Sequence, residues 1–203
     1  RSSDLIISLQ PDLVILSNAF STHVKLSTVL EESDVPVLCM EIDNKNDYMK
    51  LIRIYTALLE REDSYEKYAT DIKSEIDNII SKVPQGEKPR VMLMMCTAKG
   101  TKIKDSNSIN GEILKDLNAE IIGDNIVKGK GAVDFSMEVL LEENPDFIFV
   151  TEMGSDTEKI KRKRMEDLET SEVWSSLTAV KEGKYIILPK DLYTYKQIGR
   201  AHV

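Results

Sequence analysis

The chain has 203 residues, of which 41% are hydrophobic and 31% charged, a composition typical of one or two folded globular domains. It carries 27 lysines and arginines against 35 aspartates and glutamates, so its formal net charge is −8. This acidity argues against binding to nucleic acid or to an anionic membrane, because both select net basic surfaces. No apolar run approaches the roughly 18–20 residues that a membrane-spanning helix needs.

Few sequence features support catalysis or metal binding. The two cysteines, Cys39 and Cys96, are too few for a disulfide framework or a four-ligand zinc site, and each lies in an apolar run that predicts a buried thiol. All nine glycines lie at Gly86 or later, which excludes a glycine-rich phosphate loop from the first 85 residues. We therefore predict no catalytic residue, no resident metal and no cofactor.

Both ends of the chain depart from ordinary protein sequence. Residues 1–5 and 197–203 match translations of a common sequencing adapter and of its reverse complement. We therefore expect both segments to be scars that flank a gene fragment, with the first domain incomplete.

The first half of the chain predicts a parallel strand–helix–strand unit followed by a long helical segment. Short buried strands are expected at 12–16 and 36–42, with helical spacing of Val24, Leu26, Val29 and Leu30 between them. Residues 47–83 contain neither proline nor glycine, and their apolar residues recur at alternating spacings of four and three. Two interpretations are open for this segment, one helix of about 55 Å or two helices broken near residues 60–63. A coiled coil is a third, because the spacing fits a heptad seam.

A second α/β domain is predicted after a linker marked by Pro84, Gly86 and Pro89. We therefore divide the chain into a first-lobe remainder at 1–46, a helical connection at 47–83 and a second lobe at 84–203. The expected strands of the second lobe lie at 90–96, 146–151 and 184–188, and the expected helices at 109–118, 136–144, 156–169 and 173–177.

An internal repeat relates the two lobes. Residues 9–15 (Leu-Gln-Pro-Asp-Leu-Val-Ile) align with residues 143–149 (Glu-Asn-Pro-Asp-Phe-Ile-Phe) at an offset of 134. In each copy, a helix is expected to end before the proline and a buried strand to begin at the aspartate. Duplicated α/β lobes normally present ligands at the carboxyl ends of their strands.

These features together resemble the substrate-binding proteins of ABC importers for ferric siderophores, haem and cobalamin. The resemblance rests on the Pro-Asp repeat, the long helical segment, Ser136–Asp146, Trp174–Lys184 and Leu188–Leu192, and it covers most of residues 6–196. It implies an α/β fold of two Rossmann-like lobes joined by a long α-helix, with the ligand in the cleft. It also implies a non-enzymatic, monomeric, extracytoplasmic protein, periplasmic or lipid-anchored, that delivers its ligand to a membrane permease.

The resemblance also suggests a docking residue for the permease. In this family a glutamate seven residues before the proline of each repeat contacts permease arginines, which places Glu138 in that role. The equivalent position before Pro11 is Asp4, inside the suspected scar. The alternative is that Glu138 only stabilises the start of its own helix.

Ligand contacts are expected in the loops that follow the strands, at 17–22, 97–107, 129–135, 151–156 and 191–195. His23 is a candidate haem or metal ligand, Tyr193 and Tyr195 are candidates to contact a chelate, and Lys99, Lys102 and Lys104 are candidates to hold an anionic siderophore. Each also has a purely structural interpretation, as an exposed or packing side chain. The candidate ligand-binding residues are Ser17, Asn18, His23, Lys99, Phe135, Met153, Tyr193 and Tyr195.

Two other functions fit parts of the sequence. A doubly wound α/β enzyme that binds a nucleotide or a metal cofactor has one weak indication, Gly129-Lys-Gly131. A coiled-coil interaction protein would self-associate through residues 51–83. Because half of the cleft is expected to be absent, we predict that the chain as written binds no ligand tightly.

Overall fold

The computed structural model describes residues 2–42, 44–129 and 131–190, and it confirms the α/β class. The chain forms two compact units, Arg1–Ser74 (unit 1) and Glu75–Val203 (unit 2). The division falls inside helix α5 (Asp71–Ile80), within the segment predicted to connect two lobes. None of the helices described is long and apolar enough to cross a membrane.

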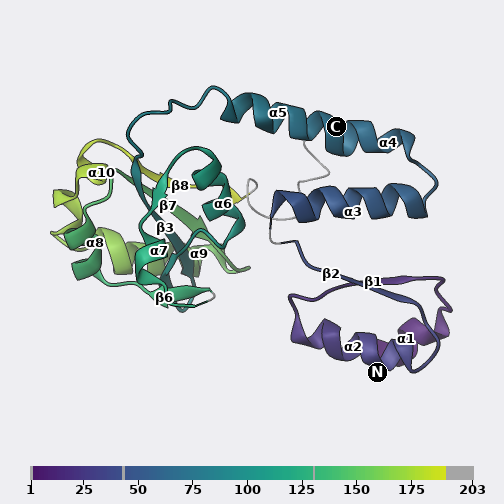
Figure 1. The fold of residues 1–203 in the computed structure, drawn as a ribbon. Coiled ribbons are helices and arrows are strands. Elements are labelled where there is room, and N and C mark those ends of the chain that lie inside the picture. Colours follow the sequence, from purple (N-terminus) through teal and green to yellow (C-terminus); the bar gives the residue numbers. More distant parts are fainter. Residues whose placement is uncertain (1, 43, 130, 191–203) are drawn as a thin grey trace. The chain divides into compact units, whose positions relative to one another are not determined.

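Unit 1 contains the predicted parallel strand–helix–strand element. Strands β1 (Val14–Ser17) and β2 (Val37–Met40) pair in parallel, with Val14 opposite Val37. Helix α2 (Ser21–Glu31) connects them and packs on both through its buried face, where Leu30 is fully buried. Helix α1 (Ser2–Ser8) precedes β1 and lies against α2 (Figure 1).

The segment predicted at 47–83 consists of two helical stretches, so the interpretation as one continuous helix was wrong. Helix α3 spans Lys45–Leu58, and a second stretch runs through α4 (Asp63–Tyr65), the π-helical segment η1 (Glu66–Thr70) and α5. The break occurs where Glu60 adopts a left-handed backbone conformation with φ of 53°. The amides of Glu60 and Arg61 donate to the carbonyls of Ala57 and Thr56, which satisfies the end of α3 as a Schellman motif does.

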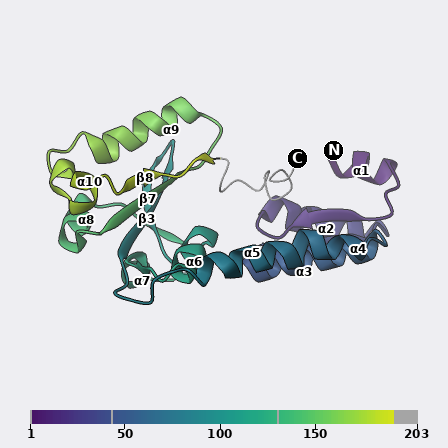
Figure 2. The same ribbon diagram turned by 90° about the horizontal axis from the view of Figure 1, so that it is seen from above.

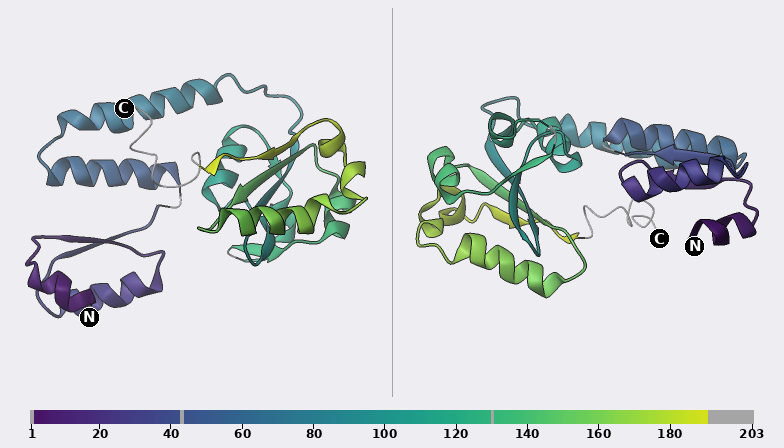
Figure 3. Two further views of the ribbon diagram at one scale, coloured as in Figure 1. Left: turned by 180° about the vertical axis from the view of Figure 1, so that it is seen from behind. Right: turned by 90° about the horizontal axis from the view of Figure 1, so that it is seen from below.

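The two helical stretches pack against each other within unit 1. Figures 1 and 3 show α3 and the beginning of the second stretch side by side. The hydroxyl of Tyr48 on α3 donates to the carbonyl oxygen of Tyr68 in η1 over 3.0 Å. Ala69 in η1 is buried. The helical segment whose apolar spacing suggested a coiled coil therefore packs against a partner helix inside the same chain.

Unit 2 is built on a sheet with strand order β6-β4-β3-β7-β8. The predicted strands are confirmed as β3 (Arg90–Thr97), β7 (Phe147–Glu152) and β8 (Tyr185–Ile187), which are mutually parallel. Strands β4 (Gly100–Lys104) and β6 (Ala132–Asp134) were expected to be cleft-facing loops. The two-residue strand β5 (Glu120–Ile121), which pairs with the start of β3, was also not predicted. Gly-Thr-Lys-Ile-Lys forms a strand because β3 and β6 flank it in antiparallel register.

Helices cover both faces of this sheet. Helix α9 (Thr157–Arg164) continues as the π-helical segment η2 (Met165–Glu169) across one face, while α6 (Ile109–Asp116) and α7 (Gly123–Ile126) lie on the other (Figure 2). Helices α8 (Met137–Glu143) and α10 (Thr178–Lys181) and the 3₁₀ turn η3 (Trp174–Ser176) complete the unit. The main core is fully buried and consists of side chains such as Met92, Met94, Ile148, Val150, Ile160 and Leu168.

The internal repeat has the same local structure in both units. Gln10 and Asn144, which are equivalent at the offset of 134, both adopt left-handed conformations, with φ of 47° and 37°. Each follows the end of a helix and precedes the proline, and a parallel strand follows in each case. The predicted helix–proline–strand repeat is therefore confirmed, but the prediction that both strands are buried is wrong for β1, where Ile15 is 46% exposed.

Candidate functional site

In unit 1, three predicted ligand residues lie together at the carboxyl end of β1. Ser17 is its last residue, Asn18 follows and is exposed, and His23 lies in the first turn of α2. The amide of Asn18 donates to the carbonyl oxygen of Met40, the last residue of β2. Phe20 is exposed and contacts the His23 ring edge-on, with centroids 5.1 Å apart.

The hydrogen bond of His23 determines which ring nitrogen is free for a ligand. The amide of Ser17 donates to Nδ1 of His23 over 3.2 Å. Nδ1 can accept this bond only without a proton, so a neutral ring carries its proton on Nε2. A metal-bound histidine normally donates a hydrogen bond from its non-ligating nitrogen. The observed contact thus disfavours iron coordination through Nε2 of His23. Among the described residues, no group of three or more His, Cys, Asp or Glu side chains could hold a metal ion.

In unit 2, the strand register brings Lys99, Phe135 and Met153 to one edge of the sheet. We call the edge formed by residues 97–99, 153–154 and 188–190 the carboxyl edge, because β3, β7 and β8 end there. Lys99 is exposed in the two-residue hairpin between β3 and β4, and Met153 is 41% exposed directly after β7. The amide of Met153 donates to the carbonyl of Cys96, and that of Phe135 to the carbonyl of Thr101. Phe135, however, packs partly against the main core.

A further lysine at the carboxyl edge was missed by the sequence interpretation. Nζ of Lys190, which follows β8, donates to the carbonyl oxygen of Gly154 in the turn after β7. Of the other proposed lysines, Lys102 forms an ion pair with Asp134 at 3.3 Å, and Lys104 lies at the far end of β4. Tyr193 and Tyr195, and the loop 191–195, lie outside the described residues.

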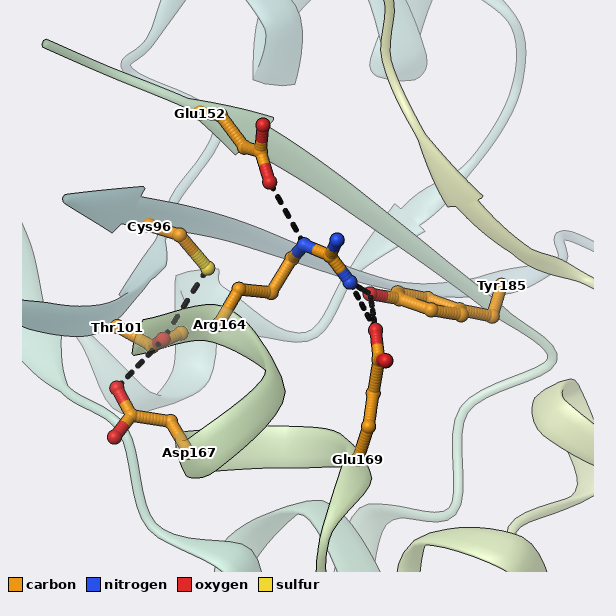
Figure 4. Close-up of polar contacts among 7 residues, drawn as sticks. All are labelled: Cys96, Thr101, Glu152, Arg164, Asp167, Glu169 and Tyr185. Atoms are coloured by element: carbon orange, nitrogen blue, oxygen red, sulfur yellow. Dashed lines mark hydrogen bonds and ion pairs between the residues drawn. The ribbon is translucent and has the colours of Figure 1, made fainter. Parts of the chain in front are cut away.

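Behind the carboxyl edge lies a polar cluster around the buried Arg164, which is 5% exposed (Figure 4). Its Nε donates to Glu152, the last residue of β7, over 2.8 Å. Its Nη1 donates to the hydroxyl of Tyr185 over 2.8 Å and to the carboxylate of Glu169, and the same hydroxyl also donates to Glu169. Burial acts to lower the pKa of Arg164, but these partners outweigh burial and raise it.

The π-helical segment η2 explains how Arg164 and Glu169 meet. Residues five apart in an α-helix point about 140° away from each other. The wider π turn, closed by the bond from the Thr170 amide to the Met165 carbonyl, brings Glu169 back toward Arg164. The cluster therefore anchors the end of β7, and with it the turn at the carboxyl edge, to the helix that covers the sheet.

A second part of this cluster contacts the thiol of Cys96. Thr101 donates its hydroxyl proton to Asp167 over 3.0 Å, so the Cys96 thiol, 3.2 Å from the Thr101 oxygen, acts as the donor in that contact. Burial raises the pKa of Cys96 to about 11. The prediction of a buried thiol is therefore confirmed for Cys96 and wrong for Cys39, which is only partly buried.

Glu138 lies in the first turn of α8 with its side chain exposed. No hydrogen bond or ion pair joins its carboxylate to another residue in the described part of the chain. Ser136, the residue before the helix, forms no side-chain cap either. Glu138 is thus sterically free to meet a partner, although its position also suits the helix dipole.

The doubly wound enzyme alternative depended on the segment from Gly129 to Gly131. Both glycines adopt positive φ, and the segment leads into strand β6. A phosphate-binding loop requires a helix whose amides point at the phosphate. In the described part of the chain, Gly131 is followed by a strand and not by a helix, which counts against this alternative.

Comparison with known proteins identifies relatives over almost the whole chain. The chain is 24% identical over 200 residues to the Fe(3+)-citrate-binding protein YfmC of Bacillus subtilis, and 29% identical over 182 residues to the iron-uptake system-binding protein of the same species. These alignments cover 94% and 87% of this chain but 58% and 55% of the relatives. The chain thus spans little more than half the length of the curated relatives it matches.

Solved structures show the same fold. An ABC transporter substrate-binding protein from Listeria monocytogenes superposes with a TM-score of 0.74 at 22% identity, covering 95% of this chain and 72% of the other. IsdE of Staphylococcus aureus, complexed with haem, has a TM-score of 0.70 at 19% identity, with 92% and 70% covered. The sequence profile of the periplasmic binding protein family matches residues 2–192. The chain therefore belongs to the periplasmic binding protein family.

Proposed function

We propose that this chain is part of the substrate-binding component of an ABC importer, which captures an iron chelate or haem outside the cytoplasm and delivers it to a membrane permease. The observation that carries the proposal is the family match over residues 2–192. The names of the two Bacillus subtilis relatives refer to iron, which favours an iron-containing ligand over cobalamin. The role is one of capture and release, so no residue is assigned a catalytic task.

Each unit has a proposed ligand-contacting region at its strand ends, as described above. Ser17, Asn18 and Phe20 supply it in unit 1, and Lys99, Met153 and Lys190 supply it in unit 2. Ligands of open α/β sheets bind beyond the carboxyl ends of the strands, where backbone groups and side chains are not already engaged in the hydrogen bonding and packing of the sheet. This placement supports the strand-end residues of the sequence prediction, with His23 in a supporting role through its bond to Ser17.

Equilibrium binding tests the proposed function. We would titrate the purified protein with ferric citrate, ferri-bacillibactin and haemin, using iron-free citrate, iron-free bacillibactin and protoporphyrin as controls, up to millimolar ligand. One iron-loaded ligand is expected to bind roughly tenfold or more tightly than its iron-free form. Because the chain spans 58% and 55% of its relatives, we expect weaker binding than theirs, measured in parallel. Absence of binding by all three ligands to protein that circular dichroism shows to be folded would refute the proposal.

Glu138 is the proposed docking residue for the permease. Its exposed carboxylate on the first turn of α8 has no partner among the described residues, so pairing with a permease cation breaks no bond within the chain. Charge pairs of this kind contribute mainly to orientation and association rate. We expect Glu138→Ala to lower ligand uptake through the cognate importer by roughly tenfold while leaving ligand affinity unchanged.

Glu142→Ala is the matched control, because Glu142 is an exposed glutamate one turn later on the same helix. Uptake by this variant is expected to stay within a factor of about two of the parent protein. Equal losses in both variants would mean that helix charge, and not a docking contact, matters.

A further inference from the structure

Helix α8, which carries Glu138, is held in unit 2 by its middle and by its carboxyl end. Leu140 is fully buried and fixes the middle of the helix in the main core. Asn144, the residue after the helix, has a left-handed backbone, and its amide donates to the carbonyl of Leu140 over 3.0 Å. At the other end, Ser136 provides no side-chain cap. The direction of α8 therefore depends on what holds its carboxyl end.

The side chain of Asn144 joins α8 to α10. Its Oδ1 accepts the amide of Thr178, the first residue of α10, over 3.1 Å, and its Nδ2 donates to the hydroxyl of Thr178 over 3.0 Å. Figures 1 and 2 show the two helices next to each other. The N-cap residue of α10, Leu177, has no side-chain cap of its own, so Asn144 satisfies an amide that α10 leaves without an intrahelical partner. One side chain thus ends α8 and starts α10.

A second set of contacts holds the same end of α8 to the sheet. The guanidinium of Arg90, the first residue of β3, donates to the backbone carbonyl and to the carboxylate of Glu143, the last residue of α8. The amide of Arg90 donates to the carboxylate of Asp146 over 2.8 Å, and its carbonyl accepts the amide of Asp146 over 2.9 Å. The carboxyl end of α8 is therefore bonded to strand β3 as well as to helix α10.

The equivalent turn in unit 1 forms without such a side-chain bond. Gln10 stands at the position equivalent to Asn144 and has the same left-handed backbone. Its side chain is exposed and makes no hydrogen bond within the described part of the chain. Glycine adopts this conformation more readily than either residue. The turn itself thus requires no asparagine side chain, and the two bonds to Thr178 serve the placement of α8.

We infer that Asn144 is a positioning residue for permease docking, because its bonds to Thr178 fix the direction of α8 and with it the place of Glu138. The inference rests on the proposed function and names a residue that acts through Glu138. At a rise of about 1.5 Å per residue, Glu138 lies about 9 Å along the helix from Asn144, so a tilt of about 10° moves it by about 1.5 Å. A displacement of this size weakens a charge pair, whose energy falls with the distance between the charges.

Residual dipolar couplings of the backbone amides test the positioning step in the whole chain, because they report the direction of α8 relative to the sheet of unit 2. Asn144→Gly removes both side-chain bonds and keeps the left-handed backbone, so circular dichroism is expected to show a folded protein. The couplings of residues 137–143 are expected to change in this variant, while those of β3 and β7 stay the same.

Two further variants separate the side chain from the turn. Asn144→Asp keeps an oxygen that can accept the amide of Thr178, so its couplings in α8 are expected to lie closer to those of the parent protein. Gln10→Gly makes the matched change at the equivalent turn of unit 1, where no side-chain bond is lost. This control is expected to leave the couplings of α8 unchanged.

Uptake through the cognate importer, measured over a range of binding-protein concentrations, tests the consequence for docking. Asn144→Gly is expected to raise the half-saturating protein concentration roughly fivefold and to leave ligand affinity unchanged. In a Glu138→Ala background the same change is expected to have no further effect, because Asn144 acts through Glu138. A general structural defect would instead lower uptake by an equal factor in both backgrounds.

The outcomes distinguish this inference from the proposed function. Unchanged α8 couplings in Asn144→Gly, or an equal loss of uptake in both backgrounds, would overturn the inference and leave the proposed function intact. Full uptake by Glu138→Ala would refute the docking role of Glu138 and the inference that depends on it. Absence of both ligand binding and uptake in the parent protein would refute the proposed function, and the inference with it.

Discussion

Arg164 is the buried cation at the centre of the polar cluster in unit 2. Its guanidinium is buried and joins Glu152, Glu169 and Tyr185, so its removal would leave two carboxylates without their cation. Removing one partner of a buried ion pair costs about 3–5 kcal/mol. Because both carboxylates are partly exposed, we expect Arg164→Met to lower the free energy of unfolding by about 3 kcal/mol, measured by urea denaturation. Arg162→Met, an exposed neighbour on the same helix, is expected to change it by less than about 0.5 kcal/mol.

Two acidic groups, the buried Cys96 thiol and the partly buried Tyr185 hydroxyl, predict how stability depends on pH. Burial raises the pKa of Cys96 from 9.0 to about 11, and burial also raises the pKa of Tyr185. The folded state therefore holds these protons more tightly than the unfolded state, and the stabilisation is complete below about pH 9 and is lost as the pH rises through about 11. Cys96 alone accounts for about 2–3 kcal/mol of this loss. Unfolding of Cys96→Ala between pH 8 and 11 should show a correspondingly shallower decline, and parallel curves for the two proteins would contradict this assignment.

At the scale of elements, the break between α3 and α4 depends on one backbone conformation. Glu60 has a φ of 53°, where a side chain is disfavoured and glycine is not. We therefore expect Glu60→Gly to stabilise the protein by about 1 kcal/mol, because glycine is the usual residue at this position of a Schellman motif. In a continuous helix the same change would destabilise by about 1 kcal/mol, so the sign of the change in urea denaturation distinguishes the two structures. Glu62→Gly, at a residue with φ of −58°, is the control and is expected to destabilise.

At the scale of the whole molecule, the two units differ in how completely they bury their apolar surface. Unit 2 has a large core with many fully buried side chains, whereas unit 1 pairs two strands and leaves Leu5, Leu9 and Phe20 more than half exposed. We expect residues 75–203 alone to fold cooperatively, with Trp174 buried against Tyr185 and giving a defined near-ultraviolet circular dichroism signal. Residues 1–74 alone are expected to lack a cooperative transition. A random-coil spectrum for residues 75–203 would contradict this prediction.

The amino-acid sequence by itself determined the α/β class, the order of the main strands and helices, and the repeat centred on Pro11 and Pro145. These features rest on apolar periodicity and on proline, whose effects are local along the chain. The apolar pattern of the sequence also located Ser17, Asn18, Lys99 and Met153 at strand ends, because a strand is expected to end where an apolar run stops.

The sequence placed a possible break of the long helical segment near residues 60–63, but only the tertiary structure decided that the segment breaks, because Glu60 occupies a conformation normally signalled by glycine. It likewise decided that Gly100–Lys104 pairs as a strand, since this short and lysine-rich segment depends on its neighbours β3 and β6. The tertiary structure also decided the hydrogen bonds of Arg164 with Glu152 and Tyr185, and that of Lys190 with Gly154. These bonds join residues that are 12–36 positions apart in the sequence. Such contacts depend on how the strands are ordered in the sheet, which local periodicity does not specify.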